Sequence, residues 1–145
     1  MQAKKSLGQN FLSDPAILKK TVAVSEVKTG DTVLEIGPGL GTLTKEILAT
    51  GANVIAVEKD HRLITPLEEK FAEEIASGKL KIIEDDILSF TFEALAAKAY
   101  KLIGNIPYYI SGEILRKFLA ADIQPQSMTL LLQKEVVERI VASKE

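Results

Sequence analysis

The chain has 145 residues, of which 46% are hydrophobic and 26% charged, and its formal net charge is -2 at pH 7. This composition is typical of one ordinary globular domain and argues against a disordered chain. Because there is no cysteine and one histidine, disulfide frameworks, thiolate metal sites and histidine-rich metal sites are excluded. No apolar run approaches the roughly 18 residues of a membrane span, and residues 1–6 lack the apolar core of a signal peptide. We therefore expect a soluble, cytoplasmic protein.

The charge balance bears on possible partners. A domain that holds nucleic acid by itself usually has a clear excess of basic residues. Here 18 lysines and arginines stand against 20 acids. Any nucleic-acid binding must therefore be local, or must use parts that lie outside this chain.

Apolar periodicity predicts strands and helices that alternate along the chain. In chain order, the sequence predicts a helix over 15–23, a strand over 32–36, a helix over 40–49, a strand over 53–57, a helix over 62–75, a strand over 80–83, a helix over 92–98, a strand over 100–103, a helix that ends at 119 with Ser111 as its N-cap, a strand over 128–132 and a helix over 133–142.

Repeated β-α units with strands that are apolar on both faces predict an α/β fold with a doubly wound, mostly parallel sheet. No low-complexity linker divides the chain, so we expect one domain over residues 1–145. The strand at 128–132 would be an exposed sheet edge, which folded proteins normally cover. We therefore expect the chain to be truncated after its fifth strand.

In such sheets, ligands bind beyond the carboxyl ends of the strands, where the strand order reverses. Four predicted strands end in polar or glycine-rich residues, which are 37–41, Glu58, 85–86 and 105–108. We expect these strand ends to line one binding site.

The first of these strand ends, residues 37–41, reads Gly-Pro-Gly-Leu-Gly. Glycines let the backbone turn tightly and approach a ligand without a Cβ in the way. A dinucleotide-binding fingerprint needs its third glycine at position 42, which is Thr42 here. The pattern therefore favours a small-molecule site of another kind, and a plain turn into a helix remains the alternative.

Acidic residues follow the second and third strands. Glu58 can accept hydrogen bonds from the ribose hydroxyls of any adenosine cofactor. Asp86 can accept from an adenine amino group, and its neighbour Asp85 leaves that assignment ambiguous by one residue. Together with Glu35, these acids would repel a pyrophosphate and would suit a positively charged sulfonium. The acids favour S-adenosylmethionine over NAD.

Residues 105–108 read Asn-Ile-Pro-Tyr and follow the fourth strand. The lone pair of an adenine amine is delocalised into the ring, so chemistry on that amine needs acceptors on its two N–H bonds. The Asn105 side chain and a backbone carbonyl at Ile106 or Pro107 can supply them, and proline fixes that backbone in advance. Tyr108 offers a face on which an unpaired base can stack. The alternative is a proline-containing turn with a core tyrosine.

With these motifs, the chain resembles the bacterial small-subunit ribosomal RNA adenine dimethyltransferases, also known as the kasugamycin-sensitivity methyltransferases. The resemblance rests on six segments in the family's order, which are 4–12 (KKSLGQNFL), 35–44 (EIGPGLGTLT), 57–60 (VEKD), 86–88 (DIL), 105–111 (NIPYYIS) and 132–136 (LQKEV). One departure is Tyr109, which stands where many members carry asparagine.

The resemblance implies a Rossmann-like S-adenosylmethionine-dependent methyltransferase fold. Residues 1–145 would be the cofactor-binding domain, with 1–13 as an N-terminal arm and with the family's C-terminal strands and helical domain absent. It implies cofactor contacts at Asn10, Leu12, Gly37, Glu58, Asp86 and Asn105. It implies contacts with the target adenine at Asn105, Pro107 and Tyr108.

In that family, the arm closes over the cofactor, Gly37 would contact its methionine part, Glu58 its ribose and Asp86 its adenine. The implied reaction transfers methyl groups to the exocyclic amines of two adjacent adenosines in small-subunit ribosomal RNA. The implied partner is that RNA or a small-subunit precursor particle, bound by a monomer and without a membrane or a metal.

Three other functions remain as hypotheses. One is the related large-subunit ribosomal RNA adenine methyltransferase of the macrolide-resistance type. Another is a non-catalytic, RNA-binding ribosome assembly factor that keeps the cofactor fold. The most distant is an NAD-dependent oxidoreductase, because Thr42 breaks its fingerprint.

Overall fold

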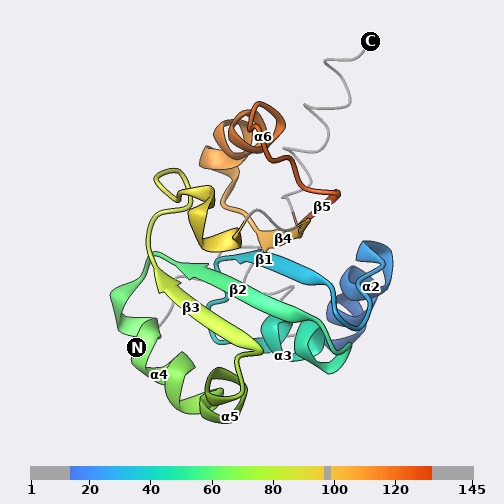
Figure 1. Ribbon diagram of the computed structural model, residues 1–145, viewed down its shortest axis with the longest axis vertical. Coiled ribbons are helices and arrows are strands. Elements are labelled where there is room, and N and C mark those ends of the chain that lie inside the picture. Colours follow the sequence, from blue (N-terminus) through green and yellow to red (C-terminus); the bar gives the residue numbers. More distant parts are fainter. Residues whose placement is uncertain (1–13, 97–98, 132–145) are drawn as a thin grey trace.

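The computed structural model of the chain, shown in Figure 1, describes residues 14–96 and 99–131. The described strands form one sheet with the order β3-β2-β1-β4-β5, and every neighbouring pair is parallel. The strands are β1 (Thr32–Ile36), β2 (Asn53–Glu58), β3 (Leu80–Glu84), β4 (Lys101–Asn105) and β5 (Ser127–Leu131). The helices are α2 (Pro15–Ser25), α3 (Thr42–Ala49), α4 (His61–Lys70), α5 (Ala72–Ala76) and α6 (Ser111–Leu119), with short 3-10 helices η1 (Phe92–Leu95) and η2 (Tyr108–Ile110).

The order of the strands puts a reversal at the centre of the sheet. The chain runs outward from β1 through β2 to β3, then returns to place β4 on the other side of β1. Ligand sites of open parallel sheets lie at the carboxyl ends of the strands beside such a reversal. The predicted doubly wound α/β fold is confirmed, and β1 and β4 are the strands that flank the expected site.

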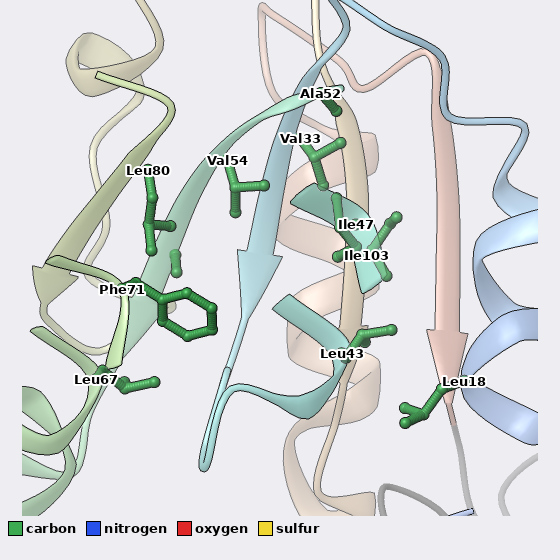
Figure 2. Close-up of a cluster of buried hydrophobic side chains, with 11 residues drawn as sticks. Leu18, Val33, Leu43, Ile47, Ala52, Val54, Leu67, Phe71, Leu80 and Ile103 are labelled. Atoms are coloured by element: carbon green, nitrogen blue, oxygen red, sulfur yellow. The ribbon is translucent and has the colours of Figure 1, made fainter. Parts of the chain in front are cut away.

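Both faces of the sheet are covered, which explains why its central strands β1 and β4 carry apolar side chains on both faces. On one face, α2, α3 and α4 pack over a buried cluster that includes Val33, Ile47 and Phe71 (Figure 2). On the other face, α6 and the segment after β3 pack over a cluster that includes Leu34 and Phe118. The side chains of neighbouring β1 residues therefore pack into the clusters on opposite faces of the sheet. Burying one such side chain stabilises the fold by about 1.5–3 kcal/mol.

The start of α2 follows from its first two residues. The Asp14 carboxylate accepts a hydrogen bond from the Ala16 N–H (2.9 Å), which satisfies a helix donor that would otherwise lack a partner. Pro15 occupies the first turn, where its missing N–H costs nothing. The helix runs to Ser25, two residues beyond the predicted end at 23, and Glu26 then adopts a left-handed conformation (φ 55°).

Two predicted helices differ from the structure because of packing around Phe71. The helix predicted over 40–49 begins at Thr42, since Gly41 still has a left-handed backbone (φ 85°). The helix predicted over 62–75 is divided into α4 and α5 at Phe71, which departs from helical geometry (φ -113°, ψ 30°). The Phe71 side chain is buried in the cluster of Figure 2, so core packing prevails over the local helical pattern.

Two other predictions along the chain were wrong in detail. The helix predicted over 92–98 is the short 3-10 helix η1, after which Ala96 turns left-handed (φ 51°). Ser111 is the first residue of α6 and not its N-cap, because η2 leads directly into the helix and Ser111 already has helical angles. The helix predicted over 133–142 lies outside the described residues. Within the described part of the chain, no helix has the length and hydropathy needed to cross a bilayer.

Candidate active site

The predicted strand ends meet along one edge of the sheet. The β1–β4 register pairs Ile36 with Gly104, so the next residues, Gly37 and Asn105, lie side by side at the ends of these two strands. A Cβ placed on Gly37 would lie 3.5 Å from the Asn105 carbonyl oxygen. The Gly37 N–H donates to the Val57 carbonyl (2.9 Å), which brings the glycine loop to the end of β2. The glycine loop therefore lies between the ends of β2 and β4.

Close packing fixes the path of the glycine loop, which we define as residues 37–41. Gly41 has a φ of +85°, and a Cβ there would lie 2.6 Å from Cε2 of Phe71. The Lys70 ammonium donates to the carbonyl of Leu40 (2.9 Å). Lys70, the last residue of α4, and Phe71, which follows it, therefore both contact the glycine loop. Neither contact was predicted from the sequence.

Glu58 is nearly buried, with 7% of its surface exposed. Its Oε1 accepts from the Gly39 N–H (3.0 Å) and its Oε2 accepts from the Asp60 N–H (2.8 Å). A carboxylate has about four acceptor positions, so two remain for a ligand. Glu58 thus orders the glycine loop and still has acceptors for hydroxyl groups.

Asp86 follows β3 and has two partners of its own. Its Oδ1 accepts from the Leu88 N–H (3.0 Å), and its Oδ2 lies 3.3 Å from the Lys59 ammonium. The Leu88 hydrogen bond, and after it the Lys59 cation, hold the pKa of Asp86 below its usual value, so this carboxylate is ionised at neutral pH. Asp85 is turned to the backbone, where its Oδ1 accepts from the Asp86 N–H (2.8 Å).

Glu35 differs from the role the sequence suggested for it. It is 1% exposed, and its Oε1 accepts from the Thr44 hydroxyl (2.5 Å). Burial raises the pKa of Glu35 to about 8, with a smaller contribution from the charge of Glu58. Glu35 is therefore largely neutral at pH 7, and Lys59 partly offsets Asp86. The expected row of three negative charges is therefore reduced.

The Asn105–Tyr108 segment forms the other side of the site. Asn105 is half-buried at the end of β4, and Ile106 anchors the segment through its N–H to the Leu131 carbonyl (3.3 Å). Pro107 is exposed, and its carbonyl accepts from the Ile110 N–H (3.2 Å) within η2. Of the two carbonyls considered as acceptors for an amine, the one at Ile106 is therefore favoured.

Three predicted site residues are not tested by this geometry. Asn10 and Leu12 lie outside the described residues. The backbone of Tyr108 begins η2, and the proposed stacking of its ring stays a prediction. Within the described ranges, no group of three or more histidine, cysteine or acidic side chains could hold a metal ion.

The family described as ribosomal RNA adenine dimethylase matches residues 1–145 of this chain. The chain belongs to this family. A curated relative, ribosomal RNA small subunit methyltransferase A of Dehalococcoides mccartyi, is 44% identical over 144 residues, which are 98% of this chain and 48% of the relative. The chain spans about half the length of the curated relatives it matches.

Solved structures agree with membership of the ribosomal RNA adenine dimethylase family. A dimethyladenosine transferase from Plasmodium falciparum is similar with a TM-score of 0.76 and 30% identity, over 88% of this chain and 45% of that one. The 23S rRNA methyltransferase ErmE also has a TM-score of 0.76, with 27% identity over 92% of this chain and 52% of that one. The fold is that of S-adenosylmethionine-dependent methyltransferases.

Proposed function

We propose that this chain carries the catalytic site of an enzyme that transfers methyl groups from S-adenosylmethionine to the exocyclic amines of two adjacent adenosines in small-subunit ribosomal RNA. The observation that carries the proposal is the closeness of the glycine loop to the Asn105 segment, because a Cβ placed on Gly37 would lie 3.5 Å from the Asn105 carbonyl oxygen. In this arrangement, a cofactor bound on the loop and an amine bound at Asn105 would be neighbours.

The residues at the sheet edge fit the proposed cofactor. A Cβ on Gly39 would meet no atom nearer than the Gly37 carbonyl oxygen at 3.9 Å, so the loop backbone has room for a ligand beside it. Glu58 would accept from the ribose hydroxyls, and the ionised Asp86 would accept from the adenine amine. When bound, S-adenosylmethionine supplies a methyl group activated by a positive sulfonium, and the acidic character of the site suits that positive charge.

The Asn105 segment would prepare the target amine. The Asn105 side-chain oxygen and the Ile106 carbonyl would accept the two N–H bonds, and the amine lone pair would then be localised for attack. Pro107, with φ -57° and ψ 139°, holds this backbone in place before the base arrives. The amine becomes acidic once it is methylated, so its proton can leave to water without a dedicated base.

The sequence relatives favour the small subunit as the source of the RNA. The curated relatives at 42–44% identity are named for the small subunit, whereas the structure is equally similar to ErmE and to the Plasmodium enzyme. We further propose that residues 1–145 act as one cofactor-binding domain with an N-terminal arm over 1–13, that Asn10, Leu12 and Tyr108 contribute to the site, and that the protein works as a monomer in the cytoplasm.

Calorimetric titration with S-adenosylmethionine tests the cofactor site, with NADH as the control ligand. We expect S-adenosylmethionine to bind and NADH not to bind. Asp86→Asn should weaken binding about tenfold, because it removes a charged acceptor. Asp85→Asn is the matched control and should change the affinity far less. Binding of NADH alone would overturn the proposal, and equal losses in both variants would remove Asp86 from its special role.

Methyl transfer to isolated small ribosomal subunits that lack dimethyladenosine tests the reaction. Asn105→Ala should slow transfer at least about a hundredfold, because an acceptor aimed at the reacting amine is lost. An assembly factor would keep its binding to the subunit and show no transfer even in the unaltered chain. Preferential methylation of large-subunit RNA would instead support the macrolide-resistance alternative.

A further inference from the structure

The segment after β3 is held in place by one side chain of α6. The Lys117 ammonium donates to the carbonyl oxygens of Ile87 (2.8 Å) and Phe90 (2.6 Å). The same ammonium lies 5.8 Å from the centre of the Phe92 ring. These contacts join α6 to a segment that lies much earlier in the chain.

The carbonyls that Lys117 holds belong to the turn that also orients Asp86. The Asp86 carboxylate accepts from the Leu88 N–H (3.0 Å), and the Asp86 carbonyl accepts from the Ser89 N–H (2.9 Å). The Phe90 N–H closes the turn on the Ile87 carbonyl (3.3 Å). Fixing the Ile87 and Phe90 carbonyls therefore fixes the direction of the Asp86 carboxylate.

Aromatic side chains pack between α6 and this turn. Phe118, next to Lys117, packs edge-on against Phe92 with 5.6 Å between ring centres, and Phe92 packs edge-on against Phe90 at 6.1 Å. Ile87 and Phe90 are themselves buried, with exposures of 5% and 4%. The rings fix the distance between the helix and the turn, and the ammonium supplies the directional bonds across it.

The charges of Lys117 and Asp86 also favour the position of the Lys117 ammonium near this turn. Lys117 is half-buried, and burial lowers its pKa, while the carboxylates of Asp85 and Asp86 act in the opposite direction. In turn, the Lys117 charge is among the causes that lower the pKa of Asp86. The ammonium therefore stabilises the ionised form of the Asp86 carboxylate as well as the backbone around it.

We propose that Lys117 is a positioning residue for the adenine of the cofactor. By tying the 86–90 turn to α6, it keeps the Asp86 carboxylate where it can accept from the adenine exocyclic amine. The inference rests on the proposed function, because it needs that amine to meet Asp86. Since α6 follows the Asn105 segment directly, Lys117 also connects the adenine side of the site to the target-amine side.

The test compares two ligands that differ at the exocyclic amine that Asp86 is proposed to contact. S-adenosylhomocysteine carries the amine, and S-inosylhomocysteine carries an oxygen in its place. Both dissociation constants are measured by calorimetry for this chain, for Lys117→Met and for Lys117→Arg. We expect the unaltered chain to prefer the adenosyl ligand, Lys117→Met to lose about tenfold of that preference, and Lys117→Arg to keep most of it because a guanidinium can also donate to two carbonyls.

Lys101→Met is the matched control, because Lys101 also holds a backbone carbonyl, that of Glu26 (2.8 Å), and a carboxylate, that of Asp31 (3.0 Å). It should lower the melting temperature and leave the ligand preference unchanged. If Lys117→Met does not fold, Lys117→Gln, which keeps one donor group, is measured in its place.

The outcomes separate the two proposals. A chain that binds neither ligand contradicts the proposed function and this inference together. A chain that discriminates between the ligands, with Lys117 variants that discriminate as well, contradicts this inference alone. An equal loss of preference in Lys101→Met would show a general loosening of the fold and would also overturn the positioning role.

Discussion

Glu35 shows how burial changes the chemistry of one residue. It lies in β1, is 1% exposed, and accepts a hydrogen bond from the Thr44 hydroxyl. Desolvation disfavours the charged form of a carboxyl group, and the pKa of Glu35 rises from 4.5 to about 8. A group that looks like a site anion in the sequence is in the fold a neutral hydrogen-bonding partner of α3.

The first prediction concerns Glu35→Gln and the pH dependence of stability. Because the pKa of Glu35 is about 8 in the folded state and its ordinary value is 4.5, the folded state binds the proton more tightly than the unfolded state. Its stabilising effect is complete below pH 4.5 and is lost as the pH rises toward 8. Urea denaturation of the unaltered chain should show the unfolding free energy falling by about a few kcal/mol between pH 5 and pH 8, which is the order of magnitude expected from this difference in pKa.

Glu35→Gln carries no proton to lose, so its unfolding free energy should change much less over the same interval. At pH 8 the variant should be the more stable of the two chains. Parallel pH profiles for the two chains would mean that Glu35 is ionised in the folded state.

At the scale of the elements, the conformation of the glycine loop depends on how closely it packs against the end of α4 and Phe71. Gly41 combines a left-handed backbone with a close approach to Phe71, and a Cβ there would lie 2.6 Å from the ring. Gly78, in the turn before β3, has a similar φ of +79° and no atom within 4 Å of such a Cβ. The two positions separate backbone strain from steric overlap.

The second prediction is that Gly41→Ala destabilises the chain more than Gly78→Ala does. Gly78→Ala should lower the unfolding free energy by about 1–2 kcal/mol from backbone strain alone. Gly41→Ala should cost a further 1–3 kcal/mol or so from overpacking, and should weaken cofactor binding because the loop moves. Equilibrium urea denaturation of both variants measures the difference, and equal losses would show that Phe71 moves aside freely.

A third prediction concerns β4, where Gly104 faces the end of β1. A Cβ on Gly104 would lie 2.8 Å from the Ile36 Cβ and 3.0 Å from the Ile36 carbonyl oxygen. Gly104→Ala must therefore push β4 away from β1 and should lower the unfolding free energy by about 1–3 kcal/mol. In Gly112→Ala, where the nearest atom is the end of Arg116 at 3.8 Å, no such loss is expected. The unfolding free energies of the two variants, measured by urea denaturation, test this prediction, and equal values would contradict it.

The sequence predicted the strands and the polar strand ends well, because both are local patterns. The strand at Thr32–Ile36 has the predicted bounds, and the strand ends at Gly37, Glu58 and Asn105 lie on one edge as expected. The break at Phe71 and the lysine contacts could not be predicted in this way, since they depend on elements that meet only after folding.

At the scale of the whole molecule, ionisable groups at the two ends of the sheet respond to pH in opposite ways. At the amino end, Asp31 accepts from the Lys28 N–H and from the Lys101 ammonium, and these bonds lower its pKa below 3.8. Its contribution to stability is present above that pH and is lost as the pH falls. At the carboxyl end, Glu35 contributes in the opposite sense.

The fourth prediction is a stability maximum in mildly acid solution, roughly between pH 4 and pH 6, from these opposite shifts. The raised pKa of His61, which pairs with Glu84, adds to the decline toward alkaline pH. Asp31→Asn should remove part of the decline on the acid side and leave the alkaline side unchanged. Unfolding free energies measured from pH 3 to pH 9 test this, and a continuous rise from pH 5 to pH 8 would contradict it.

The pairing of β1 with β4 also governs when the site can come into existence. Leu34 of β1 pairs with Leu102 of β4, so the chain must close a loop of 68 residues, from 34 to 102, before these strands meet. Contacts that span so much sequence are slow to form, because the entropy of closing the loop is lost before the pairing compensates it. On a ribosome, Gly37 and Glu58 emerge long before Asn105. We therefore expect the glycine loop and the Asn105 segment to come together only late in folding, and binding of the proposed cofactor to develop only after that.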